Sequence, residues 1–291
     1  NTEVKRNGTA LNVLSNDTLA GTTPTTAQVD IVEGTPSDAR VTIAPSTGRV
    51  TVAANTSPGT YTIDYKIAEK GNANNKSSVA RVTVVVKNKV EVTNNTSIHS
   101  GKPSVTNTPT DAGSILPNIR INGNTPTIAE VTITSARPNP LPGAPSTNVP
   151  SINTTTGKVE IPKGTPAGVY TIPYSVCDKA NPVTCINATA KVTVGTNTIK
   201  AIADTGAEVE KTNASQSMKN TAGTDDLNVL DNDQLENTTG LDHTQVEIIT
   251  TVSAIGITIN ADGRVGIATN VPAGTYTLKY KIKEIGTNNQ S

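Results

Sequence analysis

Apolar and polar residues alternate with a period of two along several segments of this chain. The clearest runs are residues 61–67, 170–176 and 276–282, where tyrosine, isoleucine, leucine or valine occupies every second position. A period of two places the apolar side chains on one face of a strand, as in an antiparallel sheet with one buried side. We also predict strands at 80–86 and 190–194, and a hairpin that pairs 41–43 with 50–52. No segment has a convincing helical period.

The same landmarks recur three times in the same order, which indicates an internal repeat. All six tyrosines form three pairs, offset by 109 and then 106 residues: Tyr61 and Tyr65, Tyr170 and Tyr174, Tyr276 and Tyr280. A Pro-Gly or Pro-Ala-Gly turn precedes each pair, and a second glycine turn followed by Arg or Lys and Val lies further upstream, at 47–50, 156–159 and 262–265. Residues 11–17 (LNVLSND) match residues 227–233 (LNVLDND).

Short strands separated by turns, in units of about 100 residues, favour β-sandwiches of the immunoglobulin type. We therefore predict an all-β chain of three tandem immunoglobulin-like antiparallel β-sandwich domains of about 106–109 residues, arranged end to end. The predicted domains are residues 1–87, 88–196 and 197–291. The first is expected to lack its first strand and the last its final strand. Either the chain is a segment of a longer tandem array, or a strand from another subunit fills the open edge, as in donor-strand complementation.

Each tyrosine pair is expected to be structural. The turn before the first tyrosine places that residue at the start of a late strand, which is the position of a tyrosine corner, whose hydroxyl bonds to upstream backbone. Alternatively, the tyrosines are simply the largest core residues of a chain that contains no Phe and no Trp.

Composition and charge exclude several classes of function. The chain has 24 basic and 24 acidic residues, so it lacks the basic footprint that nucleic acid or an anionic membrane would require. Threonine accounts for 49 of 291 residues, and no apolar run approaches the roughly 18 residues of a membrane-spanning helix. Two His, two Cys and no recurring set of acid, base and nucleophile argue against an enzyme. His99 and His243 are expected to face solvent.

Cys177 and Cys185 flank a seven-residue loop at the end of the second tyrosine strand. We expect a disulfide across this hairpin, which is typical of an oxidising compartment. A metal pair is less consistent with the sequence because no histidine is nearby, and redox chemistry favours a closer cysteine spacing.

Four aspartates crowd nine residues near the start of the third unit: Asp225, Asp226, Asp231 and Asp233. Such oxygen ligands could bind calcium at a domain junction, although the spacing does not match the twelve-residue calcium loop. The alternative is an Asn-Asp turn whose side chains bond local backbone. No other metal or cofactor is expected.

Taken together, these motifs resemble repeats of bacterial cell-surface proteins. The segment 164–177 (GTPAGVYTIPYSVC), with Asn181 to Cys185, is particularly similar to repeats of giant Gram-negative adhesins. The resemblance implies an extracellular location on the bacterial surface and a role in long fibres that carry a distal adhesive region. No ligand-binding residue is implied by it.

The leading hypothesis is therefore a structural stalk or fibre segment whose partners are the neighbouring repeats. One alternative is a pilus-like filament subunit that polymerises by strand complementation. The other is an adhesin module that binds a host ligand, which the apparent lack of exposed aromatic residues disfavours. Neither nucleic acid nor membrane insertion is expected.

Overall fold

The computed structural model describes residues 2–3, 5–6, 9–54, 56–94, 96–180, 185–210 and 214–291. Contacts divide the chain into two compact units. The first contains residues 1–90, 121–123 and 177–184, and the second contains residues 91–120, 124–176 and 185–291. We call residues 1–87, 88–196 and 197–291 repeats one, two and three. The division into three domains stays a prediction.

Repeat two contains two sheets and a short strand pair. Strands β11, β18, β17 and β14 form one sheet in that order, β12, β16 and β15 form the other, and β10 pairs with β13. The strands and the 3-10 helix η2 are β10 (Val90–Val92), β11 (Thr96–Gly101), β12 (Thr110–Ser114), η2 (Leu116–Asn118), β13 (Ile119–Ile121), β14 (Val131–Ser135), β15 (Ser151–Ile152), β16 (Lys158–Ile161), β17 (Gly168–Asp178) and β18 (Cys185–Val194). β11 and β18 are parallel, which departs from the expected antiparallel arrangement.

Repeat one has the same framework. β7 pairs with β4, β8 and β9, while β6 pairs with β1 and β5. Its elements are β1 (Thr2–Glu3), β2 (Lys5–Arg6), β3 (Thr9–Ala10), η1 (Val13–Asn16), β4 (Val29–Glu33), β5 (Val41–Ile43), β6 (Val50–Val52), β7 (Gly59–Glu69), β8 (Asn72–Lys76) and β9 (Ala80–Val86). β5 and β6 form the predicted hairpin, with Val41 opposite Val52 and Ile43 opposite Val50.

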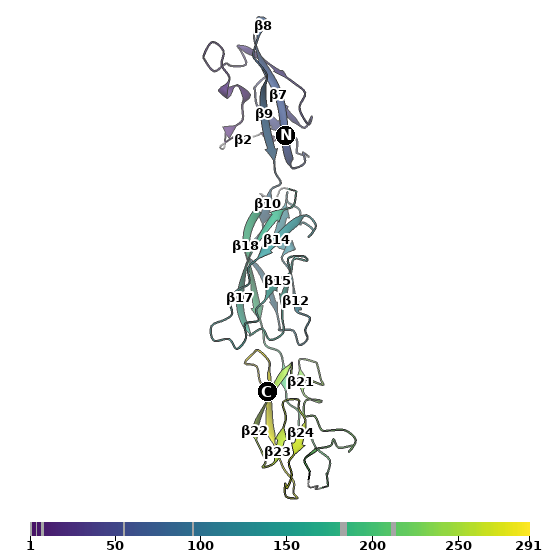
Figure 1. Ribbon diagram of the computed structural model, residues 1–291. Helices are drawn as coiled ribbons and strands as arrows, with labels where there is room; N and C mark the ends of the chain where they lie inside the picture. The colour runs from purple at the N-terminus through teal and green to yellow at the C-terminus, as the bar shows by residue number, and fades with distance from the viewer. Residues whose placement is uncertain are drawn as a thin grey trace. The chain divides into compact units, whose positions relative to one another are not determined.

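Repeat three contains β22 paired with β25, β24 paired with β20 and β23, and β19 paired with β21 (Figure 1). The strands are β19 (Ile199–Lys200), β20 (Gln216–Ser217), β21 (Gln234–Leu235), β22 (Val246–Val252), β23 (Ile257–Ile259), β24 (Val265–Ile267) and β25 (Lys279–Glu284). β25 begins at Lys279, so the prediction of a strand from Tyr276 was wrong for its first three residues. In repeats one and two the corresponding strands, β7 and β17, are hydrogen-bonded to β9 and β18. In repeat three, β25 pairs with β22 over its own length.

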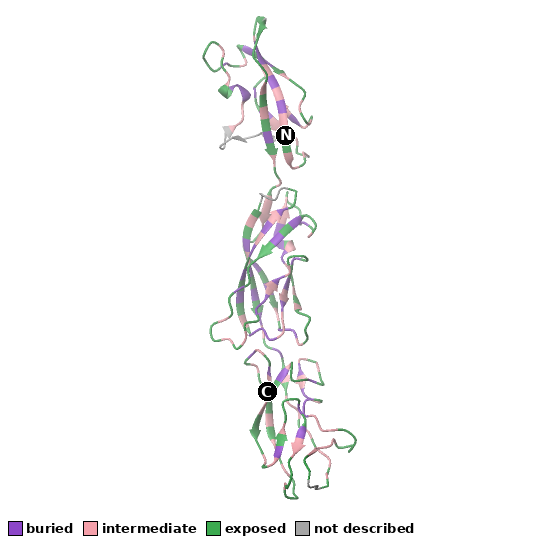
Figure 2. Cartoon of the chain, in the orientation of Figure 1, coloured by how far each residue is buried: buried purple, intermediate pink, exposed green. Residues whose placement is uncertain are grey.

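The core of each repeat is contributed by strands of both sheets. In repeat two, Val159 and Ile161 of β16 are fully buried, as are Ile172 and Val176 of β17. Buried positions alternate with exposed or half-buried ones along these strands (Figure 2). This alternation is the predicted period of two. The elements are strands apart from two short 3-10 helices, so the described fold is all-β as predicted. Among the described residues the helices are two short 3-10 turns, and none is long and apolar enough to cross a membrane.

Candidate functional site

The first tyrosine of each pair closes a tyrosine corner. Its hydroxyl donates a hydrogen bond to the backbone carbonyl four residues earlier, in the turn that contains Pro-Gly or Pro-Ala-Gly. The three distances are 2.7 Å for Tyr61 to Ser57, 2.8 Å for Tyr170 to Pro166 and 2.7 Å for Tyr276 to Pro272. The turn residues thus lie close enough to their tyrosine to be held by it, which is why the two motifs occur together in the sequence.

The second tyrosine binds the aspartate that ends the Leu-Asn-Val-Leu motif. In repeat one the Tyr65 hydroxyl lies 3.0 Å from both carboxylate oxygens of Asp17. In repeat three the Tyr280 hydroxyl donates to Asp233 at 3.2 Å. Burial and the neighbouring carboxylate together raise the pKa of Tyr65. The recurring motifs of the sequence are therefore halves of one hydrogen-bonded pair.

The carboxyl group of Asp233 lies in the interior of repeat three. One oxygen accepts the Ile202 amide at 2.7 Å, and the Asp233 side chain is fully buried. Burial raises the pKa of Asp233 to about 6, and the nearby carboxylate of Asp204 adds to this rise. Asp204 accepts from the Tyr280 hydroxyl at 2.8 Å, and burial raises its pKa as well. Two acidic groups and one phenol thus form a compact polar cluster beside the apolar core of repeat three, with Asp233 buried and the other two half-buried.

Repeat two lacks this acidic partner. Ile119 follows Asn118 just as Asp17 follows Asn16, and it is fully buried. The Tyr174 hydroxyl is also buried and has no hydrogen-bond partner among the described residues. An apolar side chain thus replaces the carboxylate, and the tyrosine remains with an unsatisfied polar atom.

The asparagine of the same motif connects it to the glycine turn. Asn12 accepts the Leu14 amide at 2.9 Å and donates to the Thr47 carbonyl at 2.8 Å. Gly48 has φ of +71°, and a Cβ there would collide with the Asn12 side chain. Gly263 meets Asn228 in the same way in repeat three. Glycine is therefore required both for the left-handed backbone and for the close approach.

The four aspartates proposed as calcium ligands have separate roles. Asp226 forms an ion pair of 2.7 Å with Lys219, and this hydrogen bond lowers its pKa. Asp225 accepts from Thr224, Asp231 is exposed and Asp233 is buried against Tyr280. Within the described ranges, no three His, Cys, Asp or Glu side chains form a group that could hold a metal ion. The structure therefore does not bring these four residues together as a calcium site.

Cys177 and Cys185 are both disulfide-bonded, as predicted. Cys177 lies near the end of β17 and Cys185 begins β18. The bond therefore joins two neighbouring strands at the hairpin end. Residues 181–184 of the predicted loop tip lie outside the described residues.

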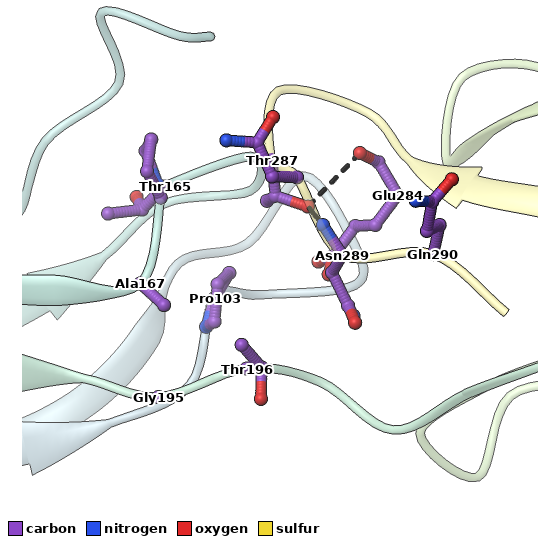
Figure 3. A pocket seen from close by; sticks show the side chains of 11 residues that line it. Pro103, Thr165, Ala167, Gly195, Thr196, Glu284, Thr287, Asn289 and Gln290 are labelled. Carbon is purple, nitrogen blue, oxygen red and sulfur yellow. Dashed lines mark hydrogen bonds between the residues drawn. The ribbon is translucent and has the colours of Figure 1, made fainter. Parts of the chain in front are cut away.

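A cavity of about 370 Å³ lies where repeat two meets the C-terminal loop of repeat three (Figure 3). Its lining contains Pro103 and Gly195 from repeat two and Glu284 and Asn289 from repeat three. The buried Glu284 carboxylate accepts hydrogen bonds from Asn289 at 3.0 Å and from Asn197 at 2.5 Å. These amides fix the carboxylate toward the joint between the repeats.

The two histidines occupy different environments. His243 is exposed. His99 is buried, so the expectation that it faces solvent was wrong; its ring bonds Ser97 at 3.0 Å and the Ala112 carbonyl at 3.1 Å. Serine and histidine form the nucleophile and base of many hydrolases, but here both are buried on β11 and the third partner is a backbone carbonyl.

Three polar residues stand outside the repeat motifs of the sequence and were not predicted. Glu284 and Asn197 lie at the joint, and Asp204 lies in the cluster with Asp233 and Tyr280. A signal exists for one of them: an acidic residue stands four positions after the second tyrosine in every repeat, as Glu69, Asp178 and Glu284.

No family model matches the chain, and no curated protein matches it in sequence. Solved structures with similar arrangements include Drosophila N-cadherin EC1-4, at 12% identity and a TM-score of 0.28, covering 89% of this chain and 62% of that one. The human desmocollin-1 ectodomain matches at 10% identity and a TM-score of 0.27, covering 88% and 50%. Mouse cadherin-23 EC22-24 matches at 10% and 0.28, covering 89% and 81%. The chain thus spans less than two thirds of the first of these structures, and scores of this size carry no argument about function.

Proposed function

We propose that this chain is a stalk or fibre segment of an extracellular bacterial surface protein, which spaces a distal adhesive region from the cell. The observation that supports this most directly is the recurrence of the same structural bonds in all three repeats. Each repeat has a tyrosine corner, and two of them also have a Tyr–Asp pair. These tyrosine hydroxyls therefore bind groups within the fold and stabilise it. Similar units in series suit a spacer.

The surface chemistry also fits this role. The chain is rich in threonine and carries 24 basic and 24 acidic residues, and a polar surface of mixed charge suits exposure to water. The disulfide of repeat two is consistent with an oxidising, extracellular location. We further propose that the protein is not an enzyme, because its Ser–His pair is buried in β11.

Light scattering and small-angle X-ray scattering on the purified chain test this function. A stalk segment is expected to be a monomer of 30.0 kDa. Its scattering should be that of a rod on the order of 100 Å or longer, as expected for three 100-residue domains in series. Concentration-dependent polymers that a synthetic last-strand peptide blocks would instead favour the filament subunit. A compact monomer would contradict both extended functions and direct attention to a ligand-binding surface.

A further inference from the structure

A left-handed backbone conformation recurs at the same place in each repeat. Ala20, Asn122 and Glu236 each follow a Leu or Ile, and their φ angles are +51°, +51° and +53°. This region disfavours residues other than glycine, and alanine and glutamate have no local side-chain bond that would compensate. A strained conformation that is retained three times indicates a shared structural requirement.

In repeats two and three this residue binds the linker that enters the repeat. The backbone N–H of Asn122 donates to the Lys89 carbonyl, and the backbone N–H of Lys89 donates to the side-chain oxygen of Asn122, both at 2.9 Å. The Glu236 amide donates to the Thr198 carbonyl, and the Thr198 amide donates to the Glu236 carboxylate, both at 2.7 Å. The left-handed backbone thus directs both the N–H group and the side chain at the same linker residue.

The preceding linker residue is asparagine in both cases, and it binds a second point. The side-chain amide of Asn88 donates to the Asp178 carboxylate at 2.9 Å, and the side-chain amide of Asn197 donates to the Glu284 carboxylate at 2.5 Å. Asp178 and Glu284 are both 2% exposed. A buried carboxylate depends strongly on such donors, because its desolvation is otherwise uncompensated.

We propose that these two positions form a socket in repeats two and three, which recognises an extended linker of the form Asn-x-(Val or Ile) and sets the stiffness of the joint. The socket residues are Asn122 with Asp178 in repeat two and Glu236 with Glu284 in repeat three. Val90 and Ile199, the third residues of the two linkers, begin β10 and β19. The proposal rests on the proposed stalk function, to which it adds the part that controls bending.

The socket of repeat three also binds the preceding repeat. Lys102, which follows β11, forms an ion pair of 2.6 Å with Glu236. The joint before repeat three therefore has an ionic bond, while the corresponding side chain in the socket of repeat two is the neutral Asn122. We expect salt to loosen the former more than the latter, because exposed ion pairs are screened.

The test places a carboxylate in the linker of the whole chain at pH 7. Asn197→Asp removes the amide donor and faces Glu284 with a like charge. We expect hydrogen exchange at the Thr198 amide to accelerate at least about tenfold, since hydrogen bonds to charged groups contribute about 1.5–3 kcal/mol. Spin labels on repeats two and three should report a broader distance distribution. The double variant Asn197→Asp with Glu284→Gln exchanges the two groups, so that one amide again faces one carboxylate. Hydrogen exchange at the Thr198 amide should then return to within about threefold of wild type.

Asn260→Asp, an exposed residue of the same repeat, is the matched charge control and should change neither readout. Lys102→Ala, on the exposed side of the joint, should make the joint before repeat three no more sensitive to salt than the joint before repeat two, without unfolding the chain. Unchanged Thr198 exchange in Asn197→Asp, or failure of the double variant to restore it in a folded chain, would overturn the socket. A compact wild-type chain would contradict the stalk and leave the socket result standing, so the two failures are distinguishable.

Discussion

The hydroxyl of Tyr65 lies 3.0 Å from both carboxylate oxygens of Asp17, a residue 48 positions earlier in the chain. Tyr280 and Asp233 form the same pair in repeat three, 47 positions apart. In repeat two Ile119 takes the place of the aspartate, and the Tyr174 hydroxyl has no partner among the described residues. The same tyrosine position thus exists in a satisfied and an unsatisfied form within one chain.

Replacing the second tyrosine by phenylalanine should therefore have different effects in different repeats. Tyr65→Phe and Tyr280→Phe remove a hydrogen bond to a carboxylate and should each destabilise their repeat by about 1.5–3 kcal/mol. Tyr174→Phe removes an unpartnered hydroxyl and should be neutral or stabilising by up to about 1 kcal/mol. Hydrogen-exchange mass spectrometry in urea resolves the three repeats in the whole chain. Equal losses in all three variants would show that the Asp partner contributes nothing.

The stability of repeat three should depend on pH through Asp233. Burial raises the pKa of Asp233 from the ordinary 3.8 to about 6. The folded state therefore binds a proton that the unfolded state has released, and this contribution to stability falls as the pH rises from 3.8 to about 6. Below that window the group is neutral in both states and the penalty is absent. Asp233→Asn should remove this fall.

The measurement is the difference between the pH profiles of wild type and Asp233→Asn. Carboxylates outside this cluster, such as Asp226, have a lowered pKa and the opposite dependence, but they contribute equally to both proteins and cancel. Asp225→Asn, at an exposed position, is the control. Parallel profiles between pH 3.8 and 6 would contradict the assignment.

Loss of the disulfide should destabilise repeat two. Cys177→Ala with Cys185→Ala opens a loop of seven intervening residues. The chain-entropy model then predicts a loss of about 2–3 kcal/mol. Reduction of the wild type should reproduce the effect, while repeats one and three should exchange at unchanged rates. Uniform acceleration in all three repeats would mean that the bond supports more than its own hairpin.

Alanine substitution should separate two requirements for glycine. Gly48→Ala places a methyl group into Asn12 and also forces alanine to adopt φ of +71°. Gly21→Ala is the matched control, since its φ is +80° and nothing lies within 4 Å of the added atom. We expect Gly21→Ala to lose about 1–2 kcal/mol from backbone strain and Gly48→Ala to lose clearly more. Thermal unfolding of both variants measures the difference, and Gly48→Ala combined with Asn12→Ala should recover part of it.

The sequence alone was enough to predict the strands whose two faces differ in polarity. β7 and β17 span the predicted alternating runs, and β5 and β6 form the predicted hairpin. The disulfide also followed from the sequence, because the two cysteines flank one hairpin loop. These features are local, because they depend on the alternation of side chains along one strand or on the turn between two neighbouring strands.

Only the tertiary structure decided which polar groups are buried and what they bind. Asp233 and Asp225 have the same chemistry in the same short segment, yet one is buried beside Tyr280 and the other is exposed. Glu284 finds its amide donor in Asn197, 87 residues earlier in the chain. The free energy of a buried carboxylate depends on donors supplied by distant segments once the sheets have packed. Alternation along one strand carries no record of those donors, so the joint became visible only in the folded chain.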